Sequence, residues 1–148
     1  AYMDEHEGRL PIEDGIDVIS VKLTFKRFLQ IAKLLDKEVA VVTDNDEDYE
    51  RNITNKYKDY EGVDSIRIFA DDKEALPTLE PQFVDANKDQ LEKLCEVIEI
   101  SSVDFSSQAA ISNYMVKNKT KWALKVFDSD KRLGYPDYIN NVIAWCDE

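Results

Sequence analysis

The pattern of apolar and polar residues predicts alternating strands and helices in the first half of the chain. Three short runs rich in β-branched residues predict strands over residues 16–21 (IDVISV), 38–43 (EVAVVT) and 65–70 (SIRIFA). Apolar residues at helical spacing predict an amphipathic helix over residues 25–35, and the polar segment 48–60 predicts a second helix. A strand–helix–strand–helix–strand order is typical of an α/β fold with a parallel sheet and right-handed crossovers.

Beyond Asp71 the pattern becomes helical. We expect a loop or strand end over residues 77–81, followed by helices over residues 88–98, 106–117, 120–128 and 137–145. The chain is therefore divided into an α/β domain, residues 1–86, and a helical C-terminal part, residues 87–148, that packs on it.

Composition limits the compartment and the chemistry. The 148 residues are 43% hydrophobic, which is enough for a core, but no apolar run approaches the length of a membrane span and no signal peptide is recognisable. Cys95 and Cys146 lack metal-ligand spacing and are expected to be reduced thiols, which favours a cytoplasmic protein without a membrane partner. His6 is the only histidine, so mechanisms that need two are excluded.

The net charge of −12 argues against nucleic acid as a partner on general electrostatic grounds. A metal-dependent nuclease site is an exception, because it requires clustered carboxylates whose charge the bound cations offset. The charge is therefore compatible with a nuclease, and it equally suits a protein-interaction module.

The most informative segment is the apolar strand that stops at Asp44 and Asp46. Parallel α/β sheets place ligands just beyond the carboxyl ends of their strands. Two carboxylates at positions i and i+2 of an extended segment point to the same side, and such oxygen ligands suit Mg²⁺. An acidic turn after the strand, with no bound metal, explains the same residues.

Two further positions are candidates for the same site. Glu80 lies in the expected loop after the third strand, which can return to the edge of the sheet that carries Asp44, although the residues alone favour an ordinary surface glutamate. Lys117, Lys119 and Lys121 precede an amphipathic segment. A lysine there can neutralise charge that develops on a metal-bound phosphate, and a solvated basic loop is the alternative.

Taken together, the segments VVTDND, TLE and NKTKWAL resemble the Toprim domain of ATP-dependent endonucleases of the OLD (overcoming lysogenisation defect) family. VKLTFKRF resembles the family's strand-to-helix step, and the similarity covers about residues 10–125. The resemblance implies a Toprim-like, Rossmann-like parallel sheet with flanking helices. It also implies that Asp44, Asp46 and Glu80 bind Mg²⁺ or Mn²⁺. Lys119 matches the catalytic lysine, four residues before Ala123, with Lys121 as the alternative register.

The resemblance further implies DNA as substrate, phosphodiester hydrolysis or nicking, and a link to phage defence. ATP would be used by an upstream ATPase domain of the same protein, and the full-length protein is expected to form a homo-oligomer. Toprim domains also use a Glu-Gly motif at the end of their first strand. No apolar strand precedes Glu7-Gly8, so we expect the motif and its strand to lie ahead of Ala1 and the chain alone to be inactive.

Two other classes remain open from the sequence. A receiver-like phosphoacceptor domain also uses acids at strand ends and a lysine, but it needs an acid pair after its first strand, and residues 16–21 are followed by Lys22. A non-catalytic interaction module is the second class.

Overall fold

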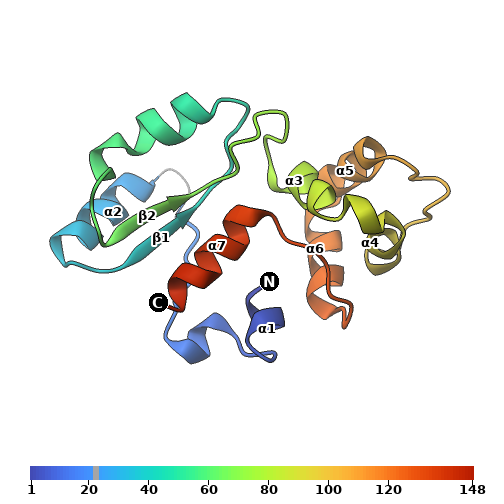
Figure 1. Ribbon diagram of the computed structural model, residues 1–148, viewed down its shortest axis with the longest axis horizontal. Coiled ribbons are helices and arrows are strands. Elements are labelled where there is room, and N and C mark those ends of the chain that lie inside the picture. Colours follow the sequence, from blue (N-terminus) through green and yellow to red (C-terminus); the bar gives the residue numbers. More distant parts are fainter. Residues whose placement is uncertain (22–23) are drawn as a thin grey trace. The chain divides into compact units, whose positions relative to one another are not determined.

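The computed structural model describes residues 1–21 and 24–148, and it is a mixed α/β protein (Figure 1). Its residues form two compact units. The sheet unit comprises Ala1–Glu74 and Asp137–Glu148, and the helical unit comprises Ala75–Pro136. The helical unit thus begins before the boundary expected near residue 86, and the last helix of the chain belongs to the sheet unit.

The sheet consists of β1 (Val39–Val42) and β2 (Ile66–Phe69), which pair in parallel with Val39 opposite Ile66 and Val42 opposite Phe69. Two of the three predicted strands are therefore confirmed, in the predicted orientation. Both are β-branched runs, which pack well on a pleated, half-buried surface. The connection between them crosses over through helical turns, as parallel strands require.

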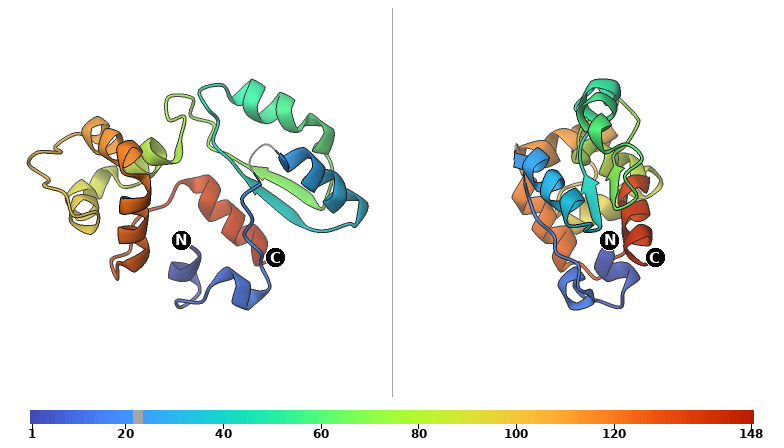
Figure 2. Two further views of the ribbon diagram at one scale, coloured as in Figure 1. Left: turned by 180° about the vertical axis from the view of Figure 1, so that it is seen from behind. Right: turned by 90° about the vertical axis from the view of Figure 1, so that its left-hand side faces the viewer.

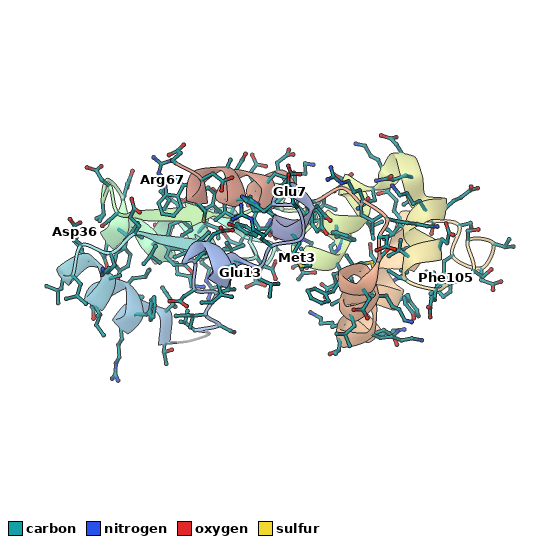
Figure 3. The ribbon with its side chains drawn as sticks, turned by 90° about the horizontal axis from the view of Figure 1, so that it is seen from below. Met3, Glu7, Glu13, Asp36, Arg67 and Phe105 are labelled. Carbon is teal, nitrogen blue, oxygen red and sulfur yellow. The ribbon has the colours of Figure 1, made fainter. Side chains whose placement is uncertain are left out.

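Helices cover both faces of this pair of strands (Figure 2, right). On one face, alternate strand residues pack against α2 (Phe25–Leu34) and against Tyr57 and Tyr60, near the short helical segments η3 (Glu50–Asn55) and η4 (Lys58–Tyr60). On the other face lies α7 (Asp137–Cys146), which contacts both strands. There the centroid of the Trp145 ring lies 6.2 Å from that of Phe69 and 5.7 Å from the guanidinium of Arg67. Figure 3 shows where Arg67 lies.

The first predicted strand is wrong. Residues 16–21 make no strand pairing, and the side chains of Val18 and Ile19 are 83% and 57% exposed. Within the described residues the sheet has only β1 and β2, so this β-branched run has no neighbouring strand with which to pair. Lys22 and Leu23, which belong to the VKLTFKRF segment, lie outside the described residues.

The helical unit contains α3 (Leu79–Ala86), η5 (Lys88–Gln90), α4 (Leu91–Val97), α5 (Gln108–Lys117) and α6 (Lys119–Asp128). The predicted helices over 88–98, 106–117 and 120–128 are confirmed with small shifts of their ends. Ser107 caps α5 by accepting a hydrogen bond from the amide of Ala110 (3.2 Å). Phe105 lies in the loop before α5 (Figure 3), and its ring packs edge-on against that of Tyr114.

One side-chain amide fixes the end of α3. The buried Asn87 donates hydrogen bonds to the carbonyls of Phe83 and Gly134 (both 2.8 Å) and accepts one from the amide of Gly134 (2.7 Å). The backbone approaches so closely here that a Cβ on Gly134 would lie 2.6 Å from the carbonyl oxygen of Ala86. The loop around Gly134 is thereby held against the end of the helix.

Two short helical segments complete the sheet unit, α1 (Tyr2–Glu5) and η1 (Pro11–Asp14). Glu7 and Gly8 follow α1 with positive φ values. None of the helices in the described ranges is long and apolar enough to cross a bilayer.

Candidate functional site

The acidic segment after β1 forms a turn that is fixed through its middle residue. Asn45 is fully buried, and its side-chain amide donates hydrogen bonds to the carbonyls of Asp71 (2.9 Å) and Lys73 (3.0 Å), in the loop after β2. Its side-chain oxygen accepts a bond from the amide of Glu47 (3.0 Å). The loops that follow the two strands are thus joined at one edge of the sheet, the edge at which parallel α/β folds bind ligands.

The backbone conformation at Asp46 does not support the prediction that Asp44 and Asp46 point to the same side. β1 ends at Val42, and both Asp46 and Glu47 adopt left-handed conformations with φ of 48° and 68°. The rule that residues i and i+2 share a side holds for extended chain, so it does not apply at Asp46. Asp44 is half-buried and Asp46 is exposed. Asn52 fastens the turn by donating to the carbonyls of Asn45 (3.0 Å) and Asp46 (3.3 Å).

Glu80 lies in a helix, whereas the sequence predicted a loop. It is the second residue of α3, and Pro81 follows it in the first turn, where a proline costs no helical hydrogen bond. Pro77 and Pro81 suggest a loop in the sequence, but a proline is also common in the first turn of a helix, and here the segment 78–81 begins α3. The consequence is burial, because only 3% of Glu80 is exposed.

Glu80 and Lys119 form an ion pair. The ammonium of Lys119, the first residue of α6, lies 3.0 Å from Oε1 of Glu80, and its side chain is 64% exposed. One turn further along both helices, the rings of Phe83 and Trp122 pack with centroids 5.5 Å apart. The pair therefore sits at the solvent end of an apolar contact between α3 and α6.

The electrostatics of Glu80 follow from this position. Burial raises the pKa of its carboxyl, but the hydrogen bond from Lys119, together with bonds involving its own backbone and Thr78, outweighs burial, so the pKa lies below its ordinary value. Oε2 of the same carboxylate is buried and has no hydrogen-bond partner within the described residues. Glu80 is therefore a charged carboxylate whose second oxygen is buried without a hydrogen-bond partner among the described residues.

Lys121 is placed differently from Lys119. Two residues along an α-helix correspond to a rotation of about 200°, so Lys121 projects from the side of α6 opposite to Lys119. It is exposed. The structure thus distinguishes the two lysines that the sequence left as alternative registers, and Lys119 is the one that contacts a candidate acid.

The structure groups the predicted site residues in two pairs. Asp44 and Asp46 belong to the sheet unit, whereas Glu80 and Lys119 belong to the helical unit. Across residues 1–21 and 24–148, no group of three or more histidine, cysteine, aspartate or glutamate side chains is arranged to hold a metal ion. A metal site composed of Asp44, Asp46 and Glu80 therefore stays a prediction.

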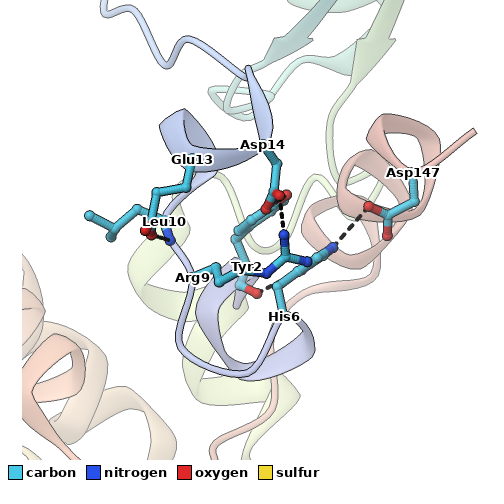
Figure 4. Close-up of polar contacts among 7 residues, drawn as sticks. All are labelled: Tyr2, His6, Arg9, Leu10, Glu13, Asp14 and Asp147. Atoms are coloured by element: carbon cyan, nitrogen blue, oxygen red, sulfur yellow. Dashed lines mark hydrogen bonds and ion pairs between the residues drawn. The ribbon is translucent and has the colours of Figure 1, made fainter.

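A second polar cluster, which the sequence did not predict, joins α1 to the end of α7 (Figure 4). His6 lies 2.9 Å from the carbonyl oxygen of Tyr2 through Nδ1 and 2.9 Å from Oδ1 of Asp147 through Nε2. A carbonyl oxygen and an ionised carboxylate both accept hydrogen bonds, so the protonated imidazole, which carries an N–H on each ring nitrogen, satisfies both contacts. The hydrogen bond to Asp147 accordingly raises the pKa of His6.

Neighbouring side chains hold the His6 ring in place. The ring of Tyr2 stacks on it at 3.8 Å, and the Tyr2 hydroxyl donates a 2.9 Å hydrogen bond to Asp14, which also pairs with Arg9. Burial, followed by the bond to Asp14, raises the pKa of Tyr2 to about 12. The network joins positions 141 residues apart, so no local pattern in the sequence could reveal it. The contacts of this polar cluster hold α1 against the end of α7, and they account for its residues without a bound ligand.

Comparisons of the chain with protein-family models, with curated proteins and with solved structures found no match. The functional argument therefore rests on the residues themselves: an acidic turn fixed beside a parallel sheet, and a buried carboxylate paired with an accessible lysine.

Proposed function

We propose that this chain is the C-terminal, Toprim-like nuclease part of an ATP-dependent DNA endonuclease of the OLD family, acting by divalent-metal-dependent phosphodiester hydrolysis. The observation that supports it most is the 3.0 Å pair between Glu80 and Lys119. The motif resemblance selected these two residues separately, from different segments, and they are in contact. A carboxylate beside a lysine is suited to phosphate chemistry, in which metal and phosphate charges must be balanced.

The acidic turn would supply metal ligands from the sheet unit. Asp44 and Asp46 offer carboxylate oxygens, the donors that Mg²⁺ and Mn²⁺ prefer, and the bonds of Asn45 and Asn52 hold the turn that carries them. Oε2 of Glu80 is buried and has no hydrogen-bond partner in the described part of the chain, so it would become a ligand only if the side chain moved. A bound ion would polarise the phosphate and lower the pKa of an attacking water.

Lys119 would act on the phosphate. Its ammonium remains largely accessible while it contacts Glu80, so a phosphate oxygen can share the same donor. Stabilising charge that develops during cleavage is worth on the order of 10²-fold or more in rate for a single donor. The exposed Lys121 projects from the other side of α6 and would take no part.

A non-catalytic interaction module is the second candidate, and the distribution of charge favours it. The sheet unit has 22 acidic and 11 basic residues, a net charge of −11, whereas the helical unit has 9 and 8, a net charge of −1. A surface as acidic as that of the sheet unit repels a DNA backbone. On this alternative the sheet unit would bind a basic protein and the full-length protein would not cut DNA.

Substitution of single acids in the full-length protein tests the proposal. Asp44→Asn and Asp46→Asn should each abolish DNA cleavage in Mg²⁺ or Mn²⁺, because each removes a metal ligand. Glu47→Gln is the matched control, since Glu47 is exposed in the same turn and also has positive φ. Cleavage at the wild-type rate by the Asp44 or Asp46 variant would contradict the nuclease mechanism, and an inactive wild type with every divalent ion would favour the interaction module.

Lys119 has its own test in single-turnover cleavage by the full-length protein. Lys119→Ala should lower the rate on the order of 10²-fold or more while DNA affinity changes little, because the contact is made mainly in the transition state. Lys121→Ala is the matched control and should retain the wild-type rate. If Lys121→Ala is inactive and Lys119→Ala is active, the assignment of the lysine is wrong.

A further inference from the structure

Two buried polar atoms of the helical unit have no hydrogen-bond partner among the described residues. They are Oε2 of Glu80, on α3, and Nε1 of Trp122, on α6. The two residues are only 3% and 6% exposed. Buried polar atoms of folded proteins are nearly always paired, so each exception needs an explanation. One of these atoms is an acceptor and the other is a donor, so a single explanation can serve both.

The two atoms belong to neighbouring layers of one contact between helices. Glu80 pairs with Lys119 at 3.0 Å. Three residues further along each helix, the ring centroids of Phe83 and Trp122 lie 5.5 Å apart. Long side chains of a helix lean toward its N-terminus, so the indole of Trp122 covers the turn that contains Lys119. The indole therefore lies beside the carboxylate that Lys119 contacts.

The residue type at position 122 indicates a polar role. Trp122 packs on Phe83 through its ring, and a phenylalanine would make the same kind of contact without burying an N–H. Indole N–H groups usually have a hydrogen-bond partner when they are buried, because burying the donor alone is costly. The tryptophan thus indicates a partner for Nε1 that the described side chains do not provide.

The spacing of the two layers fits one water molecule better than a direct contact. Three residues of an α-helix rise by about 4.5 Å. A direct N–H···O bond needs about 2.9 Å between its heavy atoms, and Nε1 of Trp122 makes none within the described residues. With bonds of about 2.8 Å at a tetrahedral angle, a bridging water spans about 4.6 Å between its two partners. One water therefore matches the separation of the layers.

The chemistry of the two atoms selects the bound molecule. An indole N–H only donates, and an ionised carboxylate oxygen only accepts. A cation would suit the carboxylate but repel the N–H dipole, and an anion would suit the N–H but repel the carboxylate. A neutral molecule that both donates and accepts satisfies the two atoms. Water is the smallest such molecule, and buried waters are held by a few polar partners of this kind.

We propose that one buried water molecule links Trp122 to Glu80, accepting the hydrogen bond of Nε1–H and donating one to Oε2, and that Trp122 thereby positions the pair of Glu80 and Lys119. The link fixes the rotation of the carboxylate, with Oε2 toward the indole and Oε1 toward Lys119. Each carboxylate oxygen has two acceptor sites, so Oε1 keeps one for a ligand beside the ammonium. The positioning role rests on the proposed function, whereas the water site does not.

NMR of the ¹⁵N-labelled 148-residue chain tests the water directly. The sequence has two tryptophans, so the spectrum has two indole N–H signals, from Trp122 and Trp145. The Trp122 proton should show a dipolar cross peak to a long-lived water, with opposite signs of the laboratory-frame and rotating-frame effects. Trp145 is half-buried and should show at most weak surface hydration. A missing cross peak at Trp122, or equal cross peaks at both tryptophans, would overturn the water link.

A matched pair of variants shows whether Glu80 holds the water. Glu80→Leu removes the acceptor and keeps an apolar side chain of similar size, so the cross peak of Trp122 should be lost. Glu92→Leu removes an exposed acid of the same unit and should leave it unchanged. Thr78→Val removes a hydroxyl that bonds Glu80 and should also keep it. A cross peak that persists in Glu80→Leu, or disappears in Thr78→Val, would overturn the link.

Single-turnover cleavage by the full-length protein tests the positioning role. Trp122→Phe keeps an aromatic ring but removes the N–H, and it should lower the rate by about tenfold or more with little change in DNA affinity. Trp145→Phe makes the same change in the sheet unit and should retain the wild-type rate. A wild-type rate in Trp122→Phe would overturn the positioning role.

The two readouts separate this inference from the nuclease proposal. If the water cross peak is present and the full-length wild type does not cut DNA, the water link stands and the nuclease proposal fails. If the full-length protein cuts DNA and the cross peak is absent, the nuclease proposal stands and the water link fails.

Discussion

The two units differ in how completely they bury their apolar residues. The helical unit has one cluster of ten buried core residues, including Phe83, Leu94 and Ile111, whereas the corresponding cluster of the sheet unit has four. Of the thirteen large hydrophobic residues that are exposed in the described ranges, nine belong to the sheet unit. Helices satisfy their backbone hydrogen bonds internally and need only side-chain packing, whereas a sheet also needs neighbouring strands.

The difference in burial has a consequence for the stability of the two units. A two-stranded sheet is only marginally stable by itself and depends on the helices that cover it. We therefore expect core substitutions in the helical unit to cause the largest losses in the free energy of unfolding. We expect the stability of the sheet unit to depend more on what binds to it or pairs with its strands. Substitutions at Leu94, Asn87 and Lys119 perturb the helical unit, and a substitution at His6 perturbs the sheet unit.

The largest effect is expected in the core of the helical unit. Leu94→Ala removes a fully buried side chain and should lower the free energy of unfolding by about 2–5 kcal/mol, through lost burial and the cavity that is left. Leu124→Ala, on the exposed face of α6, is the matched control and should change it by less than about 0.5 kcal/mol. Urea unfolding followed by circular dichroism measures both, and equal effects would show that the core is not closely packed.

The next effect concerns the contact between Asn87 and Gly134. Asn87→Ala removes four hydrogen bonds of a buried side chain, including one from the side-chain amide of Gln90, and should cost about 1–3 kcal/mol, because the carbonyl and amide of Gly134 lose their partner. Gly134→Ala should be destabilising as well, since its Cβ would meet the backbone of Ala86 at 2.6 Å. Thermal unfolding compares them with Asp89→Ala. A melting temperature unchanged by both variants would contradict the contact.

Breaking the Glu80–Lys119 pair should have a smaller effect that depends on pH. The pKa of Glu80 is lowered in the folded state, so the pair stabilises the protein above the unfolded-state pKa, and this stabilisation is lost as the pH falls through the folded-state pKa. Lys119→Ala should therefore destabilise at pH 7, by about 1–2 kcal/mol for a partly exposed pair, and have less effect at low pH. Urea unfolding of both proteins at several pH values measures this, with Lys121→Ala as control.

The sequence predicted those parts of the fold and of the candidate site that depend on contacts between residues close together in the chain. β1 and β2 were found because a buried parallel strand shows itself as a short apolar run. Residues 16–21 show the same pattern but have no partner among the described residues, and pairing is not a property of the segment itself. The helical position of Glu80 was missed because the flanking prolines suggested a loop. Its contact with Lys119 was indicated only by resemblance, since the two positions are far apart in sequence.

The smallest effect is expected at His6, and it has the opposite pH dependence to Glu80. The pKa of His6 is raised in the folded state by Asp147, so the contact contributes fully below the unfolded-state pKa of about 6.5 and is lost as the pH rises through the higher folded-state value. His6→Gln should destabilise the protein at pH 6 and become indistinguishable from wild type at pH 9. His6 belongs to the sheet unit, so the loss should appear as faster hydrogen exchange in α1 and at the end of α7, while α3 to α6 stay unchanged. Exchange measured at both pH values decides the matter: an effect of His6→Gln that grows with pH would show that the imidazole is neutral in the folded protein and that the contact with Asp147 is not an ion pair.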